Sequence, residues 1–266
     1  MTVRQHDLSR FIAFADALAD AARAAILPHF RSGGACDNKS ADGFDPVTAA
    51  DRASEAAMRA LIGAEFPEHG VLGEEFERKA SRSGYEWVLD PIDGTRAFIA
   101  GLPTWGVLIA LAYEGEPIVG VMDQPYLDER YRGWNDGADA IIRGARRTLV
   151  TRRCASLPEA ILSTTSPDLF HGAEAEAFAL ARGAAKLTRY GYDCYAYAMI
   201  AAGHMDCVIE SGLKSFDIQA LIPVLTGAGG GVCNWRGASA AQGGQVLAFG
   251  DARVRAAALA LLEHAS

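Results

Sequence analysis

Positive charge is in short supply along this chain of 266 residues. It carries 25 Lys and Arg against 33 Asp and Glu, so its formal net charge at pH 7 is −8. A protein that binds nucleic acid usually presents a clustered basic face, and we therefore expect no nucleic-acid partner. No uncharged apolar run approaches the ~20 residues that a membrane-spanning helix requires, so we expect no membrane association either.

Cysteine is also scarce, and its spacing argues against two further classes. The five cysteines are odd in number and form no C-x-x-C pair, so neither a zinc site nor a disulfide framework is predicted. The N-terminal stretch carries charges at Arg4, Asp7 and Arg10 and lacks the apolar core of a secretory signal. Together these features predict a cytoplasmic protein with reduced thiols.

The first half of the chain predicts helices followed by antiparallel strands. Apolar residues recur at helical spacing over 9–31. A polar, Gly-rich loop is expected over 32–45, and a second helix should begin near Thr48 and end before Pro67. Short apolar runs alternate with turn signals over 105–133, which is typical of antiparallel strands joined by tight turns.

In the second half, short stretches typical of strands alternate with longer stretches typical of helices. Strands are expected at 161–163, 186–190 and 206–210, and helices at 174–182, 195–202 and 217–226, with Gly203 and Gly227 at helix C-caps. This βαβα rhythm predicts a sheet covered on both faces. We predict an α+β domain over 1–145 and an α/β domain over 146–266.

One segment concentrates two acids beside a turn that suits a phosphate. An apolar run leads directly into Asp90-Pro91-Ile92-Asp93-Gly94-Thr95. Pro91 fixes φ and stiffens the turn, while Gly94 allows a ligand to approach the backbone closely. The N–H groups of Gly94 and Thr95 stand at a helix start, which favours an anion, and the aspartates supply the oxygen ligands that Mg²⁺ prefers. The alternative interpretation is an N-cap at Asp93 in an ordinary turn.

This motif resembles the signature of the inositol monophosphatase family, whose members are lithium-sensitive, magnesium-dependent phosphatases. Further segments resemble the family's other motifs in order and spacing: Asp45-Pro46-Val47-Thr48-Ala49-Ala50-Asp51, Gly73-Glu74-Glu75, and Phe216-Asp217 with Gly227-Ala228-Gly229-Gly230 downstream. The resemblance covers essentially the whole chain. It implies a layered αβαβα sandwich of the inositol monophosphatase and sugar phosphatase type, an α/β fold with an α+β N-terminal half, and commonly a homodimer.

The resemblance also implies two to three Mg²⁺ ions in each active site. Glu74, Asp90 and the backbone carbonyl of Ile92 would hold the first ion. Asp90, Asp93 and Asp217 would hold the second. Most of these ligands fall in the predicted domain 1–145, and the domain 146–266 would complete the active site and the substrate pocket.

The remaining implied roles concern catalysis. Asp51 would assist a third, weaker ion and orient Thr95. Thr95 and Glu74 would position the attacking water, and Gly94 and Thr95 would hold the phosphate. A phosphate monoester dianion repels a nucleophile, so its hydrolysis depends mainly on positioning and charge neutralisation. No cysteine or histidine nucleophile is required.

Each acid also has a structural interpretation. Thr48 and Asp51 fit a capping box, Asp217 fits a helix N-cap, and Glu74 and Glu75 fit solvated loop acids. Their joint presence at strand ends and helix starts, where ligands collect in α/β proteins, favours the functional interpretation.

The substrate must be chosen by the second half of the chain. Segments 96–103, 162–167 and 193–197 resemble the histidinol-phosphatase branch of the family. Asp193 stands where the inositol branch has small neutral residues, and Glu210 matches the family's substrate-hydroxyl-binding Glu. Histidinol phosphate carries an ammonium and an imidazole, and two carboxylates would bind such cations by charge-assisted hydrogen bonds. L-Histidinol phosphate is therefore the predicted small-molecule substrate.

Two alternatives stay open from the sequence. An inositol-1-phosphatase or a broad sugar-phosphate phosphatase shares the core motifs. A non-catalytic relative that senses metal or ligand is disfavoured because Asp93, Thr95 and Asp217 are all present. The tyrosines near 190–197 are expected to pack in the interior, with Tyr192 alone facing the pocket.

Overall fold

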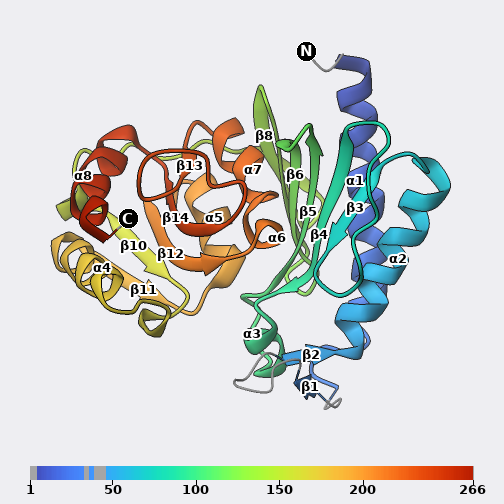
Figure 1. Ribbon diagram of the computed structural model, residues 1–266, viewed down its shortest axis with the longest axis horizontal. Helices are drawn as coiled ribbons and strands as arrows, with labels where there is room; N and C mark the ends of the chain where they lie inside the picture. Colours follow the sequence, from blue (N-terminus) through green and yellow to red (C-terminus); the bar gives the residue numbers. More distant parts are fainter. Residues whose placement is uncertain (1–4, 33–35, 39–45, 266) are drawn as a thin grey trace.

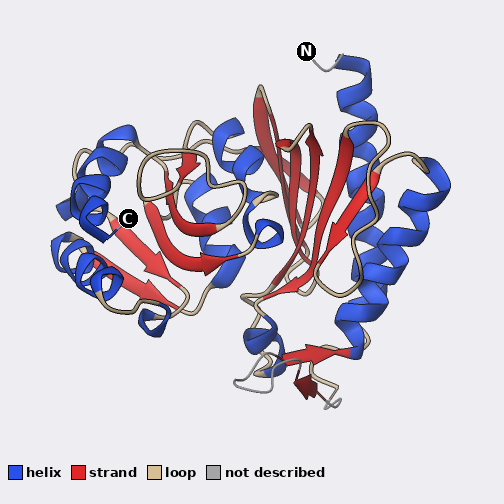
Figure 2. Ribbon diagram, in the orientation of Figure 1, coloured by secondary structure: helices blue, strands red, loops and turns tan. Residues whose placement is uncertain are grey.

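The computed structural model describes residues 5–32, 36–38 and 46–265. Five layers follow one another in the order helix, sheet, helix, sheet, helix, which confirms the predicted αβαβα architecture (Figure 1). Figure 2 shows the two sheets side by side, with helices outside each sheet and between them. Within the described ranges, no helix combines the length and the apolar character that crossing a membrane requires.

The first sheet has seven strands in the order of the chain. They are β3 (Gly70–Gly73), β4 (Tyr85–Asp93), β5 (Gly106–Tyr113), β6 (Glu116–Gln124), β7 (Glu129–Trp134), β8 (Gly137–Ile142) and β9 (Ala145–Thr148). β3 and β4 are parallel, and every later pair of neighbours is antiparallel. The antiparallel strands predicted over 105–133 are therefore confirmed.

Helices α1 (Gln5–Ile26) and α2 (Ala49–Glu65) cover the outer face of this sheet (Figure 1). Both present an apolar stripe, and the buried residues Leu18, Met58 and Ile62 belong to one core with the strand residues beneath them. Burial of such a stripe supplies most of the stability of a surface helix.

The helix bounds follow local chemistry. α2 begins after Thr48, as predicted, because the Thr48 hydroxyl accepts a hydrogen bond from the Ala50 N–H. α1 ends at Ile26, sooner than the predicted 31, since Pro28 has no N–H and disfavours helical backbone before it. Part of the stretch predicted as a loop pairs instead: β1 (Cys36–Asn38) runs antiparallel to β2 (Pro46–Thr48). Asp45 lies outside the described residues.

The second sheet has five strands in the order β11-β10-β12-β14-β13. They are β10 (Ile161–Thr164), β11 (Leu187–Tyr190), β12 (Cys207–Leu213), β13 (Gly231–Cys233) and β14 (Gly244–Phe249). The first three strands in this order are parallel to one another, and β14 and β13 add antiparallel pairs. α4 (Ala173–Ala184) and α8 (Ala252–Leu262) cover its outer face (Figure 1).

The middle layer holds α5 (Asp193–Ala201), α6 (Ser215–Ile218) and α7 (Leu221–Gly227). The single helix predicted over 217–226 is therefore wrong, because the chain breaks into α6 and α7 around Gln219 and Ala220. Gly203 adopts φ +77° after α5, as its C-cap prediction requires.

Close packing explains the glycine at the end of α7. A Cβ on Gly227 would lie 2.2 Å from the carbonyl oxygen of Gly137 in β8, so this glycine serves a close backbone approach. The left-handed conformation falls instead on Gly229, at φ +93°. α7 thus lies directly against the first sheet and joins the second half of the chain to it.

Candidate active site

A bulge in β4 brings the two aspartates of the acidic motif to one side of the strand. In a regular strand, residues three apart point to opposite faces. Here Asp90 pairs with Leu108 and Asp93 pairs with Gly106, so three steps along β4 oppose two steps along β5. The extra residue forms a bulge that re-aims the following side chain. The strand thus continues through Pro91, where the sequence indicated a turn.

Asp217 joins this pair from the middle layer. Its carboxylate accepts a hydrogen bond of 2.6 Å from the Lys214 N–H, which anchors the first turn of α6. One carboxylate oxygen from each of Asp90, Asp93 and Asp217 lies within 4.8 Å of the other two. We call these three residues the acid cluster. Anchoring a helix and facing a shared site are compatible, since a carboxylate has several lone pairs.

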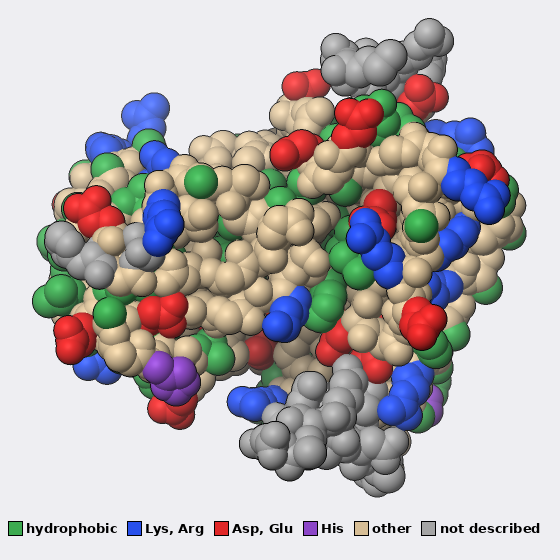
Figure 3. Space-filling model, viewed as in Figure 1, with side chains coloured by type: hydrophobic (Ala, Val, Ile, Leu, Met, Phe, Trp, Pro, Cys, Tyr) green, Lys and Arg blue, Asp and Glu red, His purple; other side chains and the backbone are tan. Residues whose placement is uncertain are grey.

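Glu74 approaches the acid cluster from the end of β3. The last residue of β3, Gly73, pairs in parallel register with Leu89 of β4, so Glu74 and Asp90 follow at the same edge of the sheet. The charge of Glu74 raises the pKa of Asp90 and of Asp217. Acidic side chains are visible on the walls of the notch between the two halves of the molecule (Figure 3).

Burial dominates the electrostatics of the acid cluster. Desolvation raises the pKa of Asp90 well above its usual range, and the charges of Glu74 and Asp93 raise it further. Desolvation also raises the pKa of Asp93 well above its usual range, with Asp193 as the next cause. Burial raises the pKa of Asp217 to about 6, although the hydrogen bond from Lys214 opposes this shift.

This donor set fits a hard divalent cation. Carboxylates that repel one another must share protons or accept a counter-ion. The oxygen atoms of the acid cluster are the donors that Mg²⁺ prefers. A further oxygen, Oδ1 of Asp51, is buried and has no hydrogen-bond partner among the described residues, and the charge of Asp51 also raises the pKa of Asp90.

Asp51 and Thr95 each form hydrogen bonds close to their own place in the chain. Oδ2 of Asp51 accepts hydrogen bonds from the backbone N–H and the hydroxyl of Thr48, at 2.8 and 2.6 Å. This completes the predicted capping box. The Thr95 hydroxyl donates to the carbonyl of Ile92 at 3.0 Å, and the role of Asp51 in orienting Thr95 stays a prediction.

Gly94 and Asp193 lie against each other where the two halves meet. Gly94 adopts φ +86° at the start of α3 (Thr95–Ile99). A Cβ on Gly94 would lie 2.9 Å from the carboxylate carbon of Asp193, so only glycine leaves room for this acid. The next residue, Cys194, donates its N–H to Oδ2 of Asp93 at 2.6 Å. α5 and β4 are therefore joined at the acid cluster.

Glu210 lies in β12 with an exposed fraction of 2%. Its carboxylate accepts hydrogen bonds from the N–H and hydroxyl of Thr165, at 2.8 and 3.0 Å, and from the hydroxyl of Thr164 at 3.2 Å. Burial raises the pKa of Glu210 to about 8, against the opposing effect of these donors. The structure thus brings Glu210 to the same cavity as Asp193.

Tyr197 is a residue of this cavity that sequence reasoning missed. The cavity has a volume of about 20 Å³, room for about one water molecule. Its lining residues are Asp93, Thr165, Asp193, Cys194, Tyr197, Glu210, Leu213 and Asp217. Within the described part of the chain, the buried Tyr197 hydroxyl has no hydrogen-bond partner. Tyr192, which was expected here, instead accepts hydrogen bonds from Arg189 at 2.8 and 3.1 Å.

The signal for Tyr197 was present in the sequence. Residues four apart share one face of a helix, so Tyr197 follows Asp193 on the same side of α5. The aromatic run around it suggested packing and concealed this spacing.

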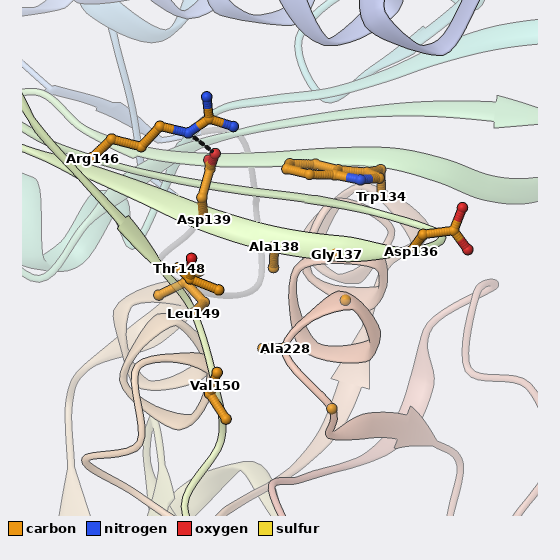
Figure 4. A pocket seen from close by; sticks show the side chains of 12 residues that line it. Trp134, Asp136, Gly137, Ala138, Asp139, Arg146, Thr148, Leu149, Val150 and Ala228 are labelled. Atoms are coloured by element: carbon orange, nitrogen blue, oxygen red, sulfur yellow. Dashed lines mark hydrogen bonds and ion pairs between the residues drawn. The ribbon is translucent and has the colours of Figure 1, made fainter. Parts of the chain in front are cut away.

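A larger pocket lies away from the acid cluster. Its volume is about 630 Å³, and it is bounded by β8, β9 and the chain after α7. Figure 4 shows Asp139 paired with Arg146 at one side of this pocket, where Nε of Arg146 lies 2.5 Å from Oδ2 of Asp139. Paired charges and apolar side chains offer little chemistry, so size alone does not make this pocket the active site.

Comparisons with known proteins agree with the motifs. A model described as the inositol monophosphatase family matches residues 7–265. The chain is 43% identical over 268 residues to the bifunctional phosphatase IMPL2, chloroplastic, of Arabidopsis thaliana, covering 97% of this chain and 76% of that protein. It is 37% identical over 209 residues to a histidinol-phosphatase of Mycobacterium tuberculosis, covering 76% and 79%.

A solved structure extends the agreement to three dimensions. An inositol monophosphatase from Zymomonas mobilis superposes with a TM-score of 0.85 at 39% sequence identity, covering 96% of this chain and 98% of that chain. The sequence match and the shared fold both span the acid cluster and the helices around it. The chain belongs to the inositol monophosphatase family.

Proposed function

We propose that this phosphatase-family protein hydrolyses a small-molecule phosphate monoester with Mg²⁺ held by the acid cluster. The observation that carries the proposal is the convergence of Asp90, Asp93 and Asp217 within 4.8 Å, under burial that raises the pKa of all three. Bringing so many buried acids together is unfavourable unless a cation compensates them.

We propose the division of ligands that the family resemblance implies. Glu74, Asp90 and the Ile92 carbonyl would hold one ion, and Asp90, Asp93 and Asp217 a second. Asp51 would assist a third, weaker ion with Oδ1, the oxygen that no described residue contacts by a hydrogen bond. Bound Mg²⁺ would supply positive charge for the phosphate and acidify a water molecule.

The chain's own groups would orient the reactants. The Thr95 hydroxyl donates its proton to Ile92, so its oxygen is left to accept a hydrogen bond from the attacking water. Glu74 would accept the second proton of that water. The N–H groups of Gly94 and Thr95, in the first turn of α3, have no helical acceptor and would bind phosphate oxygens.

We propose L-histidinol phosphate as the substrate, a step in histidine biosynthesis. Asp193 and Glu210 line one cavity beside the acid cluster, and both carboxyls have a raised pKa, about 6 for Asp193 and about 8 for Glu210. An ammonium group, which is similar in size to a water molecule, would restore their charged forms through charge-assisted hydrogen bonds. The relatives named histidinol-phosphatase support this choice.

Inositol-1-phosphate or another sugar phosphate is the second candidate substrate. The Zymomonas mobilis protein is named an inositol monophosphatase, and the Arabidopsis thaliana relative is named bifunctional. In this case the Tyr197 hydroxyl and the Glu210 carboxylate would form hydrogen bonds with hydroxyl groups of the substrate.

The experiment is a phosphate-release panel with purified protein. Histidinol phosphate, inositol-1-phosphate, fructose-1,6-bisphosphate and an adenosine phosphate are compared with Mg²⁺ and with chelator. We expect Mg²⁺-dependent release, highest kcat/KM for histidinol phosphate, and strongly reduced release from the Asp93→Asn control. Release that persists after exhaustive chelation contradicts the magnesium proposal, while equal kcat/KM for inositol-1-phosphate contradicts the histidinol proposal alone.

We further propose a reducing compartment, the cytoplasm, for this protein. The cysteines whose side chains are described are buried free thiols: Cys154, Cys194, Cys207 and Cys233. Fractionation of cells that express the protein tests this placement. The homodimer implied by the family stays a prediction, which sedimentation velocity tests.

A further inference from the structure

α2 places a buried carboxylate beneath the turn that carries Glu74. Glu55 has an exposed fraction of 0%, although an isolated buried charge is strongly unfavourable. One oxygen of Glu55 accepts a hydrogen bond of 2.7 Å from the Glu75 N–H. The other accepts a hydrogen bond of 2.7 Å from Nε of Arg59, one helical turn later. Both oxygens therefore have a donor, and the charge has a counter-ion.

The same turn is held at two further points. A Cβ on Gly73 would lie 1.9 Å from the Glu55 carboxylate, so the backbone before Glu74 lies directly on this acid. Arg59 also donates to the carbonyl of Phe76 at 3.1 Å, and its guanidinium lies 5.9 Å from the centre of the Phe76 ring. The residues on either side of Glu74 are thus fixed to α2.

Consequently, the position of Glu74 depends on α2 as well as on β3. Glu74 follows β3 at the edge of the sheet where Asp90 follows Leu89 in β4, and its charge raises the pKa of Asp90 and Asp217. A group that supports a metal ligand through hydrogen bonds can control the orientation of that ligand. Losing such support typically lowers metal affinity about 10–100-fold.

We infer that Glu55, together with Arg59, is a positioning residue that holds the Gly73-Glu74-Glu75 turn so that Glu74 can bind metal. The inference rests on the magnesium site proposed above. It assigns no contact with substrate or metal to Glu55. Its effect should therefore appear in metal affinity and, because Glu74 would also orient the attacking water, in kcat, with little change in substrate KM.

The test compares Glu55→Gln with the wild-type protein. A glutamine offers one acceptor and one donor group, so it cannot accept from both Arg59 and the Glu75 N–H. The melting temperature is followed while Mg²⁺ is added to chelated protein, and the midpoint of the rise gives the apparent affinity. We expect the midpoint to move about 10-fold higher, with the same shift in the Mg²⁺ dependence of phosphate release.

A matched control separates positioning from general stability. Asp206 is another buried carboxylate, exposed by 1%, that accepts a hydrogen bond of 2.6 Å from the Ile161 N–H and pairs with Arg152. Asp206→Asn should lower the melting temperature of the apo protein while leaving the Mg²⁺ midpoint unchanged. If Glu55→Gln does not fold, Arg59→Lys is the second variant. It keeps the positive charge but loses the guanidinium that donates to both Glu55 and the Phe76 carbonyl, so it should also raise the Mg²⁺ midpoint.

The outcomes are distinguishable from failure of the proposed function. If the melting temperature of the wild-type protein does not change when Mg²⁺ is added, the result contradicts both the metal site and this inference. A wild-type shift with an unchanged midpoint in Glu55→Gln, or an equal change in Asp206→Asn, overturns the positioning role and leaves the metal site standing.

Discussion

Removal of Mg²⁺ should make the stability of this protein fall as the pH rises. Burial raises the folded-state pKa of Asp217 from 3.8 to about 6, so the folded protein holds a proton that the unfolded chain releases. The stabilisation is complete below pH 3.8 and is lost as the pH rises through about 6. Glu210, with a pKa raised from 4.5 to about 8, extends the loss to about pH 8.

The magnitude for Asp217 follows from its pKa. A difference of about 2 between the folded and unfolded pKa corresponds to about 3 kcal/mol of unfolding free energy. For a chain of this size, about 1 kcal/mol moves the melting temperature by roughly 2–4 °C. Asp217 alone should therefore lower the melting temperature by about 6–12 °C across its titration.

The assay is thermal unfolding at fixed ionic strength between pH 4.5 and 8, with chelator or with saturating Mg²⁺. The chelated protein should lose stability across this range, and Asp217→Asn should flatten the slope. With Mg²⁺ the dependence should reverse, because the ion binds the charged carboxylates of the folded state. A chelated protein whose melting temperature stays level or rises from pH 4.5 to 8 would refute this reasoning.

Three further predictions concern activity. Asp93→Asn should keep the fold but reduce phosphate release at limiting Mg²⁺ by on the order of 100-fold, since an amide is a weak magnesium ligand; near-wild-type turnover would place the site elsewhere. Ca²⁺ should replace Mg²⁺ poorly in the same assay, because it requires more ligands at longer distances. Asp193→Asn should lower kcat/KM for histidinol phosphate about 10–100-fold, from roughly 1–3 kcal/mol of lost pairing, with little effect on inositol-1-phosphate. Equal losses on both substrates would remove Asp193 from substrate choice.

Hydrophobic periodicity, capping residues and turn residues predicted the helices and strands well where a single local signal dominated. Thr48 capped α2 as its chemistry requires, and the turn signals over 105–133 marked antiparallel strands. The break between α6 and α7 was missed because it falls where the backbone of Ala220 lies against Gly120 of β6: a Cβ on Gly120 would lie 1.9 Å from the Ala220 carbonyl oxygen, and the sequence around the break does not report that contact. The division into domains at 145 stays a prediction.

The acid cluster was predictable only in part. The motif placed Asp90 and Asp93 together, but the bulge that turns them to the same side depends on pairing with β5. The approach of Asp217 followed from the family resemblance, since nothing in the spacing of residues 93 and 217 brings them together. Glu55 gave no signal at all, because a glutamate within an amphipathic helix usually faces solvent, whereas here Gly73 lies directly on it.

The most direct test of the account is a crystal of the protein soaked with Mn²⁺ in place of Mg²⁺ and measured for anomalous scattering. The account predicts peaks between Asp90, Asp93 and Asp217, at about 2.0–2.2 Å from their carboxylate oxygens, with one peak also in reach of Glu74. Soaked crystals whose anomalous peaks all lie away from the acid cluster, in a protein that still releases phosphate, would contradict the central claim.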